Sequence, residues 1–525
     1  MRRTPQLAQI AFLLVVILLP AVSKAIPAFS RQYGTSCSTC HIDFPKLNDF
    51  GKAFKDAGFK FPKDDESFLK TPPIMLGSPA AAEAFPKMMY PGTIPGLPPI
   101  GLRYNTFFQV VNGTANNPNL TLPKGTVGTY VPTTDFQPGY FSIFTAGNFG
   151  SGAAFWVDDD ISVAGANSNG GLGDGYLKFV NLGRVIKLPT DVASLRVGQF
   201  ELDLPFSQAR SWNLSGWDIF DEANVGVMNS LSPQQNVNNG FAFSSPAEGV
   251  EISGGHTFQG YHYSAAVFDQ NTTGISAAPP NVDPANGVGF VSDSNFKDLY
   301  GRFSYRFNLE KDAASRNDVQ AAGNSGPRDH TYLSLGSFYF YGKSVQRMSG
   351  FLADGVTPTV ITAREPYYRV GGDVSFNYRT FNLFGVYMAG HDHNLVPVTI
   401  GSAAGPSTFA AGRAATFGGG FIQADYLVLP WVMAIMRYDT VRSTADRVNW
   451  VQYDSTAPPG TFFSPYSATR NRFTPGIQLL IHANIKASFE YQIRPQQIIY
   501  DPSTGLPLTK PYRTNSAVAA LEWVY

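Results

Sequence analysis

The sequence predicts an all-β protein, a transmembrane antiparallel β-barrel of about sixteen strands with a small α-helical segment near its N-terminus. Charged residues make up only 15% of the 525 residues, whereas ordinary globular chains carry about 25%. Aromatic residues reach 14%, with 41 Phe and 25 Tyr. From Leu102 onward, apolar and polar residues alternate with a period of two, which is the pattern of strands with two unlike faces. Low charge and one apolar face per strand are what a barrel in lipid requires.

The composition excludes several other classes of protein. A disordered chain would be charged and poor in aromatic residues, and a long helical bundle would be dominated by Ala, Glu, Lys, Leu and Arg. The 39 basic and 39 acidic residues balance, so no nucleic-acid partner is expected. Two Cys in the whole chain exclude a disulfide-rich scaffold. No Ser/His/Asp set, phosphate loop or paired acid and base stands out, and no catalytic residue is predicted.

Residues 1–25 predict a secretory signal peptide. Arg2 and Arg3 precede an apolar run of 13 residues from Ile10 to Val22, and Ser23-Lys24-Ala25 supplies small residues at a cleavage site. The alternative, a membrane-spanning anchor, needs ~20 apolar residues. Cleavage removes three positive charges and takes the net charge from 0 to −3. We therefore expect export from the cytoplasm.

Both cysteines of the chain lie in one pentapeptide, Cys37-Ser38-Thr39-Cys40-His41. C-x-x-C-H is the attachment signal for c-type haem, because two thiols at this spacing can bond to the two vinyl groups of one porphyrin. A redox C-x-x-C pair is expected near a βαβ pattern, a disulfide here closes too short a loop to stabilise much, and zinc needs more ligands. We expect one covalent haem c, held by Cys37 and Cys40, with His41 as the proximal ligand.

The sequence leaves the second axial ligand open. Of the seven histidines only His41 lies before residue 256, so Met75 is the first candidate and the pair Met88-Met89 the second. Met more often fills gaps in a core, and the other possibilities are a histidine from the rest of the chain or an open site. His/Met ligation would raise the haem potential above that of bis-His ligation.

Residues 44–58 predict a helix that follows the motif. Its apolar residues recur every three or four positions; they are Leu47, Phe50, Ala53, Phe54 and Ala57. Gly58 supplies a C-terminal stop. We expect this stripe to lie against the haem, because a cytochrome domain of residues 26–70 has few other apolar surfaces; an ordinary core helix is the alternative. Five lysines could make a docking face for an acidic carrier or a solvated surface; they are Lys46, Lys52, Lys55, Lys60 and Lys63.

Residues 71–100 are rich in Pro, Gly and Ala and predict a linker before a barrel of residues 101–525. In Leu299 to Leu309 the odd positions are mainly apolar and the even positions mainly polar, and residues 477–493 show the same parity around a turn expected at Ala483-Asn484. The other strand candidates are 102–112, 139–147, 152–163, 174–182, 193–201, 239–243, 248–255, 260–269, 331–342, 367–379, 381–390, 415–428, 430–442 and 515–525.

Short joins alternate with long ones along the barrel, as in bacterial outer-membrane barrels with tight periplasmic turns and longer outer loops. Arg379-Thr380 and Leu429-Pro430 are short joins, and the long ones are 202–238, 270–297 and 443–471. The chain ends in Trp523-Val524-Tyr525, and a terminal aromatic residue resembles the last strand of such proteins. A soluble β-sandwich or a propeller is the alternative, although the chain shows no repeat of constant period.

The order of these features resembles a known family. Ile26-Pro27-Ala28-Phe29 follows the signal peptide, and the pentapeptide is followed by Phe44-Pro45-x-Leu47-Asn48-x-Phe50-Gly51-x-x-Phe54 and then by a porin-like barrel. This arrangement resembles the fused monohaem cytochrome c–porin family, whose best-known members are outer-membrane iron-oxidation cytochromes. The resemblance is specific over about residues 25–60 and architectural over the barrel.

The resemblance implies a small cytochrome in or at the mouth of a barrel in the bacterial outer membrane. Extracellular Fe(II) would give one electron to the haem, and a periplasmic carrier such as a soluble cytochrome would receive it. Cys37 and Cys40 would be the thioether sites and His41 the proximal ligand. One haem spans only part of a ~30 Å hydrocarbon layer, so we expect it inside the lumen or reached there by a partner.

Other functions remain compatible with the sequence. The chain could be a solute porin whose haem segment is a plug or sensor, could export electrons outward to a metal oxide, or could be a haem enzyme such as a peroxidase with an open distal position. Two motifs carry donors that suit metal ions, His391-Asp392-His393 and Asp158-Asp159-Asp160. Motifs of this kind more often lie in a solvated loop or line a lumen, and we expect that for both.

Overall fold

The computed structural model describes most of the predicted barrel and the segment around the pentapeptide. The predicted signal peptide lies outside the described residues, as do Met88, Met89 and Lys63. Within the described ranges no helix is both long and apolar enough to cross a bilayer. The described residues are 28–61, 74–75, 79–84, 93–94, 100–114, 131–149, 152–162, 171–184, 187, 189, 191–208, 210–222, 227–229, 232–237, 243, 246–269, 297–309, 331–352, 354, 356–393, 395–398, 408–411, 414–443, 469–493, 499–500, 507–508 and 515–525.

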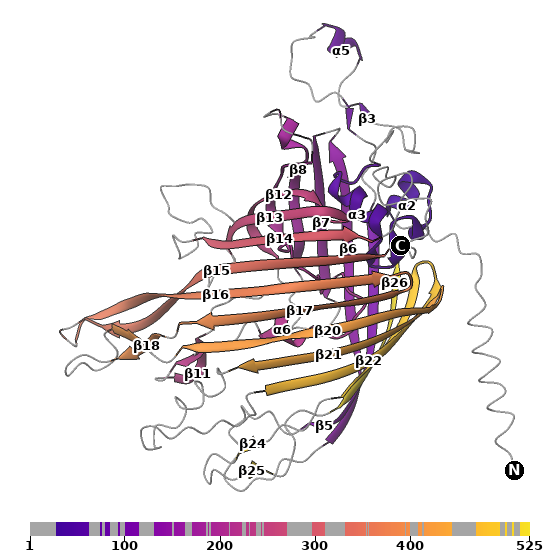
Figure 1. Cartoon of the computed structure of the whole chain (residues 1–525). Coiled ribbons are helices and arrows are strands. Elements are labelled where there is room, and N and C mark those ends of the chain that lie inside the picture. Colours follow the sequence, from indigo (N-terminus) through magenta and orange to yellow (C-terminus); the bar gives the residue numbers. More distant parts are fainter. Residues whose placement is uncertain are drawn as a thin grey trace, which may run out of the picture.

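Sixteen antiparallel strands close into one barrel, which confirms the predicted fold class (Figure 1). The last strand, β26, pairs with the first, β5, and so closes the ring. The strands are β5 (Ile100–Thr114), β6 (Val131–Phe149), β7 (Ala153–Ser162), β8 (Gly171–Phe179), β9 (Ser194–Phe200), β12 (Ala247–His256), β13 (Gln259–Asp269), β14 (Asp298–Asn308), β15 (Tyr332–Phe351), β16 (Pro358–Tyr378), β17 (Phe381–Asp392), β20 (Ala415–Leu429), β21 (Val432–Ser443), β22 (Thr469–His482), β23 (Ile485–Gln492) and β26 (Ser516–Val524).

Each strand has an exposed apolar face and a buried face, as the period of two predicts. In β14 the odd positions are exposed, and Phe303 is 52% exposed, whereas Tyr300 and Arg306 are buried inside the barrel. Successive side chains of a strand point to opposite sides, so the exposed residues lie on the outer wall. An apolar outer wall is what a membrane-spanning barrel presents to lipid.

The two ends of the barrel differ in the length of their connections. Two or three residues join β6 to β7, β12 to β13, β16 to β17, β20 to β21 and β22 to β23, and the last of these joins is the predicted turn Ala483-Asn484. Ile100 and Tyr525 lie at the same end, where Leu102 and Tyr525 exchange backbone hydrogen bonds of 2.8 and 2.7 Å. We call this end the short-turn end. In bacterial barrels the short turns face the periplasm.

Several strand candidates differ from the structure in kind or in length. Of the candidate 239–243 the structure describes only Phe243, which lies in a turn and is buried; residues 239–242 lie outside the described residues. The candidates 331–342 and 367–379 are parts of the longer strands β15 and β16. These two strands continue to pair with each other beyond the points where β14 and β17 stop pairing with them.

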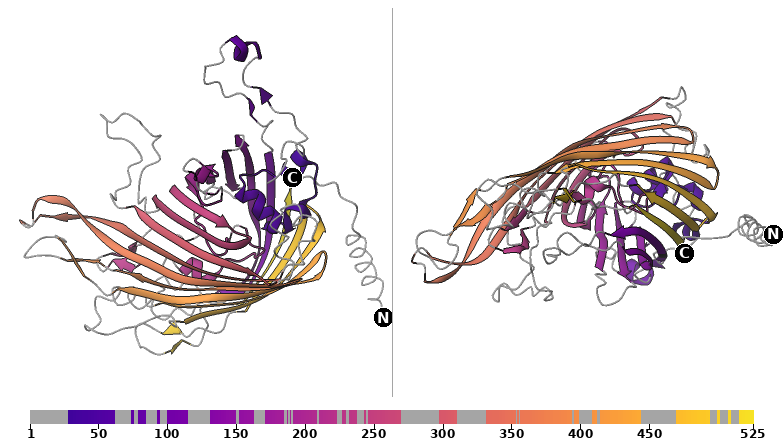
Figure 2. Two further views of the ribbon diagram at one scale, coloured as in Figure 1. Left: turned by 45° about the horizontal axis from the view of Figure 1, so that its top comes forward. Right: turned by 90° about the horizontal axis from the view of Figure 1, so that it is seen from below.

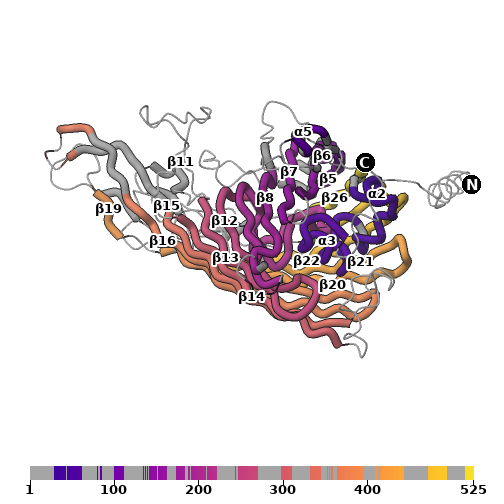
Figure 3. Tube along the Cα trace, turned by 90° about the horizontal axis from the view of Figure 1, so that it is seen from above, coloured from indigo at the N-terminus to yellow at the C-terminus, as the bar shows by residue number. Residues whose placement is uncertain are grey.

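The N-terminal elements that carry the pentapeptide lie on the inner side of the barrel wall, as Figures 2 and 3 show for the indigo helices α2 and α3. They are α2 (Ala28–Tyr33), the 3₁₀ turn η1 (Cys37–Thr39), the hairpin β1 (His41–Asp43) and β2 (Lys46–Leu47), and α3 (Asp49–Asp56). The helix predicted over 44–58 therefore begins only after the hairpin. It stops where predicted, because Gly58 has φ +77°, which glycine adopts readily. We call residues 28–61 the plug.

A second segment also turns into the barrel. Residues 201–222 follow β9 and end in α6 (Asp218–Glu222); we call them the inner segment. Its Trp217, Ile219 and Phe220 are at most 1% exposed and belong to one buried apolar cluster with side chains of eight strands, β12 to β17, β20 and β21. We call this cluster the lumen core. It occupies space that a sixteen-stranded barrel otherwise leaves to water.

The remaining described elements are small. Four two-stranded sheets and two short helices complete the description. They are β3 (Ile74–Met75) with β4 (Thr93–Ile94), β10 (Val227–Asn229) with β11 (Ser232–Val237), β18 (Leu395–Val398) with β19 (Thr408–Ala411), β24 (Ile499–Tyr500) with β25 (Pro507–Leu508), α5 (Pro79–Ala84) and η2 (Leu182–Arg184).

Candidate haem-attachment site

The two cysteines flank a single 3₁₀ turn. Cys37 begins η1, and the backbone N–H of Cys40 donates to the carbonyl of Cys37 over 3.1 Å. In a 3₁₀ turn the side chains at positions i and i+3 eclipse each other. Cys37 and Cys40 are unbridged and half-buried. The turn therefore presents both thiols on one side, which is the arrangement that two bonds to one porphyrin edge require.

Asn48 fastens this turn to the start of α3. Its side-chain amide donates to the carbonyls of Ser38 and Thr39 over 3.1 and 3.0 Å, and its Oδ1 accepts the backbone N–H of Gly51 over 2.8 Å. Its own backbone N–H donates to the carbonyl of Cys40 over 2.9 Å. Asn48 is thus both the N-cap of α3 and the clamp that holds the backbone of the pentapeptide.

Gly51 allows the turn to lie directly on the helix. A Cβ at this position would stand 2.1 Å from the carbonyl oxygen of Cys40. The obstructing atom belongs to the backbone and is itself held by Asn48. Any side chain at residue 51 would therefore push the pentapeptide away from α3.

His41 stands in the hairpin that follows the turn. It pairs with Leu47 of β2, and its ring lies 5.6 Å from the ring of Phe44, centroid to centroid. Its Nδ1 is buried and makes no hydrogen bond within the described part of the chain. Burial lowers the pKa of His41 to about 4, so the imidazole is neutral at neutral pH, which is the form that binds metals.

The pKa values of the two thiols are shifted in the opposite direction to that of a reactive thiol in a redox pair. Burial raises the pKa of Cys37 and raises the pKa of Cys40 to about 12. Reactive C-x-x-C pairs instead have a cysteine whose pKa is lowered. Two thiols on one side of a turn, followed at once by a neutral imidazole with an unpartnered nitrogen, fit a c-type haem.

Ion pairs and hydrogen bonds hold the plug to strands around the barrel. The carboxylate of Asp49 accepts hydrogen bonds from both Nη atoms of Arg306 of β14, over 2.8 and 2.7 Å. Asp56 accepts from the backbone N–H and Oγ1 of Thr257 at the β12–β13 turn, over 3.2 and 2.8 Å. These wall residues lie next to connections at the short-turn end. The CSTCH motif is therefore fixed at that end of the lumen.

The apolar stripe of α3 packs against other aromatic side chains of the plug and against the wall. Phe54 lies 5.0 Å from Phe29 and 5.6 Å from Tyr33, centroid to centroid. The same buried cluster includes Ala146 of β6 and Ala154 of β7. The expectation that this stripe has few other apolar surfaces to meet is wrong, because α2 and the barrel wall supply them.

Two of the five lysines expected on a carrier-docking face or a solvated surface contact the barrel instead. Lys46 pairs with Asp425 of β20 over 3.4 Å and lies 4.2 Å from the ring of Trp212. Lys55 is half-buried near Arg210 and Arg196, and desolvation lowers its pKa to about 7. The prediction is wrong for these two lysines because insertion of the plug turns them toward the lumen. Neither of them lies on a solvated helix surface.

The two motifs with metal donors divide their side chains between the faces of the wall. His391 stacks on Tyr368, centroids 5.4 Å apart, on the outer face, whereas Asp392 is buried and paired with Arg369. Asp159 is exposed, whereas its neighbour Asp158 accepts from Trp156 over 2.6 Å. In the described part of the chain no three His, Cys, Asp or Glu side chains gather as a metal set.

Met75, the predicted distal ligand, lies on β3, which pairs with β4. Its side chain is outside the description, and so are Met88 and Met89. A distal role for Met75 stays a prediction.

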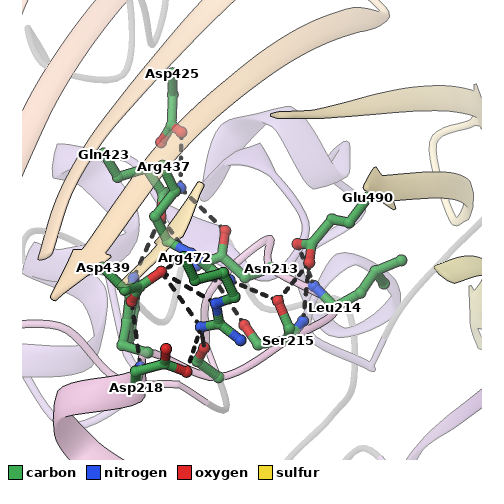
Figure 4. A network of polar contacts seen from close by, with 12 residues as sticks. Asn213, Leu214, Ser215, Asp218, Gln423, Asp425, Arg437, Asp439, Arg472 and Glu490 are labelled. Atoms are coloured by element: carbon green, nitrogen blue, oxygen red, sulfur yellow. Dashed lines mark hydrogen bonds and ion pairs between the residues drawn. The ribbon is translucent and has the colours of Figure 1, made fainter. Parts of the chain in front are cut away.

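A polar network ties the inner segment to the barrel wall (Figure 4). Glu490 of β23 accepts from the backbone N–H groups of Leu214 and Ser215 over 2.7 and 3.1 Å. Arg472 of β22 pairs with Asp218 over 3.0 Å. Asp425 receives an amide hydrogen bond of 2.8 Å from Gln423 and also pairs with Lys46 of the plug. The network thus reaches from the inner segment to the plug.

Sequence reasoning missed the residues that hold the motif. Asn48 carried a usable signal, because Asn is among the favoured N-cap residues and it directly precedes most of the apolar stripe of the helix. Arg306, Asp425 and Lys486 carried none, since each lies more than 250 positions from its plug partner. Only the closed barrel brings them to the plug.

Comparisons with known proteins were made by sequence and by structure. No family model matches the chain, and no curated protein matches it. Among solved structures it is similar to the anion-selective porin from Comamonas acidovorans, at 12% identity over 81% of this chain and 98% of that one, with a TM-score of 0.45. It is also similar to the outer membrane channel DcaP of Acinetobacter baumannii, at 10% identity over 82% and 97%, with a TM-score of 0.43. Likenesses at this level carry nothing about function, and the barrel assignment rests on the chain's own strand pairing.

Proposed function

We propose that this chain is an outer-membrane electron-transfer protein of the fused monohaem cytochrome c–porin type, with a c-type haem in its plug. The observation that carries the proposal is the position of CSTCH. Both thiols lie on one side of a turn, His41 follows with an unpartnered nitrogen, and the motif sits inside the short-turn end of a closed barrel. An apolar outer wall and a predicted signal peptide support an outer-membrane location.

In this proposal the residues of the plug bind and orient the cofactor. Cys37 and Cys40 form the thioether bonds, His41 is the proximal ligand, and Met75 is the candidate distal ligand. A haem bound there supplies one-electron exchange. The buried setting of His41 keeps its imidazole neutral and fixed in the hairpin, and Asn48 holds the turn that carries the thiols.

We further propose that electrons enter from outside the cell and leave to a soluble carrier in the periplasm. Fe(II) is the proposed donor, because the electron can cross while the metal, which forms insoluble products when oxidised, remains outside. The short-turn end supports this direction of exit. It is the periplasmic end of bacterial barrels, and it holds the motif within reach of a periplasmic partner.

The first test is covalent attachment of haem. We expect the purified protein to give a haem-staining band on a denaturing gel, and we expect Cys37→Ala with Cys40→Ala to abolish it, because both thioether bonds are lost. Ser38→Ala, in the same turn, should retain the band. A band that survives in the double variant would contradict covalent attachment.

The second part of the test is the donor. Anaerobic addition of Fe(II) to the oxidised protein should produce the absorption bands of reduced haem within seconds to minutes. A protein that dithionite reduces but Fe(II) does not would contradict Fe(II) as donor and would favour outward export or a sensor role.

A solute porin with a haem plug is the second candidate. The strand number favours it, because sixteen-stranded barrels can enclose an aqueous channel. The plug and the lumen core oppose it, since both place buried side chains across the lumen.

A further inference from the structure

Three charged residues meet on the lumen wall where the barrel closes. Arg103 of β5 donates Nε to Glu522 of β26 over 2.6 Å, and Lys486 of β23 pairs with the other oxygen of Glu522 over 3.0 Å. The three strands are consecutive neighbours, since β26 lies between β23 and β5. Lys486 is 5% exposed and Glu522 8%. We call Arg103, Lys486 and Glu522 the closure triad.

The closure triad touches the plug next to the proximal histidine. Lys486 donates Nζ to the carbonyl of Phe44 over 2.9 Å. The Lys486 amine and the Arg103 guanidinium each lie 5.8 Å from the centre of the Phe44 ring. That ring lies 5.6 Å from the ring of His41. Only one aromatic ring therefore separates the triad from the imidazole that would ligate the iron.

The triad carries a net positive charge. Two cations share one carboxylate, so one positive charge remains uncompensated among these three residues. Charges buried in protein are screened much less than charges in water. Placing an electron near a fixed positive charge is favourable, and the same charge opposes its removal. A cofactor at His41 therefore lies in a field that favours its reduced form.

We propose that the closure triad raises the reduction potential of the haem held by His41 and so determines which donors the protein can oxidise. This inference rests on the proposed function. The step is a one-electron transfer from a reductant such as Fe(II), which loses one electron, to the ferric iron, which gains it. No bond forms or breaks, and no proton moves. Arg103, Lys486 and Glu522 are positioning residues, because they act through charge and do not ligate the iron.

The test uses two substitutions that change the local charge in opposite directions. Lys486→Met removes one positive charge and should lower the potential. Glu522→Gln removes the one negative charge, keeps the shape of the side chain and should raise the potential. Each substitution is expected to change the one-electron equilibrium constant on the order of tenfold. A tenfold change corresponds to a shift of about 59 mV in the reduction potential. The measurement is a potentiometric titration of the visible spectrum of the full-length protein in detergent.

Shifts of the reduction potential in opposite directions in the two variants distinguish an effect of charge from damage to the fold. A disturbed plug would shift the potential in the same direction in both variants or change the positions of the absorption bands. Lys486→Arg keeps the charge and should keep the wild-type potential. Asp392→Asn, in the buried ion pair at the far end of the barrel, is the matched control and should also leave it unchanged.

Shifts of the same sign in the two triad variants, or no shift in either, would overturn the inference while leaving the haem itself established. If the wild-type protein carries no covalent haem, the proposed function falls, and this inference falls with it. The gel and the titration therefore distinguish the two failures.

Discussion

Single residues at the motif show how steric fit sets the geometry of the thiols. Gly51 is the clearest case, because its missing side chain lets the carbonyl of Cys40 lie against α3. An alanine in a helix interior normally stabilises by up to about 1 kcal/mol relative to glycine. Here the opposing cost is larger, since the obstructing carbonyl is backbone that is held by Asn48 and cannot rotate aside.

We predict that Gly51→Ala lowers the stability of the plug by about 1–3 kcal/mol, the usual cost of overpacking, and reduces the fraction of protein that carries haem several-fold. The measurement is the ratio of haem absorbance to protein after purification. Gly152→Ala is the control, because a Cβ at Gly152 meets nothing within 4 Å. Equal haem content in Gly51→Ala and wild type would show that the turn can move away from α3.

At the scale of elements, α3 is an amphipathic helix whose polar residues are used inside the barrel. Asp49 at its start and Asp56 at its end both bond to the wall. Lys55, one residue earlier than Asp56, is half-buried near Arg210, Arg196, Lys178 and Asp174. Three of these four neighbours are cations. They repel the charged form of the Lys55 amine when the plug lies inside the barrel.

This burial predicts a pH dependence of stability. The pKa of Lys55 is about 7 in the folded protein, below its ordinary value of 10.5. Between these two pH values the unfolded chain binds more protons, so the contribution of Lys55 makes the free energy of unfolding rise with pH. We predict that Lys55→Met raises the urea midpoint at pH 7 and weakens its increase toward pH 9.5.

The control for this prediction is Lys52→Met on the same helix, which should retain the wild-type increase, because the Lys52 amine is paired with the carboxylate of Asp49. Urea midpoints in detergent at the two pH values give the comparison. A Lys55→Met variant whose pH dependence equals that of the wild type would contradict the prediction.

At the scale of the whole molecule, the barrel encloses two segments of its own chain, the plug and the inner segment. The plug lies at the short-turn end, the inner segment is bonded to β21, β22 and β23, and the lumen core joins that segment to the wall from β12 to β21. Electrons can pass through packed protein, whereas hydrated solutes cannot. A lumen that holds these two buried clusters suits a conduit for electrons better than a route for solutes.

We predict that the intact protein shows no steady ion conductance in a planar bilayer, in contrast to an open sixteen-stranded porin. Arg472→Met with Glu490→Leu should release the inner segment and produce intermittent openings, because it removes two of its anchors to the wall. A large, steady conductance in the wild type would contradict electron transfer as the main role and would favour the solute porin.

The sequence predicts those features that depend on local chemistry and on periodicity. Alternation with a period of two reflects side chains that point to opposite sides of a strand, so the closed barrel and most of its strands could be found without a structure. The haem assignment to Cys37, Cys40 and His41 depends on five consecutive residues and remains a prediction to be tested with the protein. The end of α3 could be read from Gly58.

Only the tertiary structure decided what surrounds the motif. The contacts that hold the plug join residues hundreds of positions apart, such as Asp49 with Arg306 and Phe44 with Lys486, and no local pattern encodes such a pair. Insertion of the plug also reversed the expected role of Lys46 and Lys55, because a helix face that looks solvated in sequence can face a lumen. The physical reason is closure: β26 pairs with β5, and that pairing creates the enclosed space that holds the plug and the inner segment.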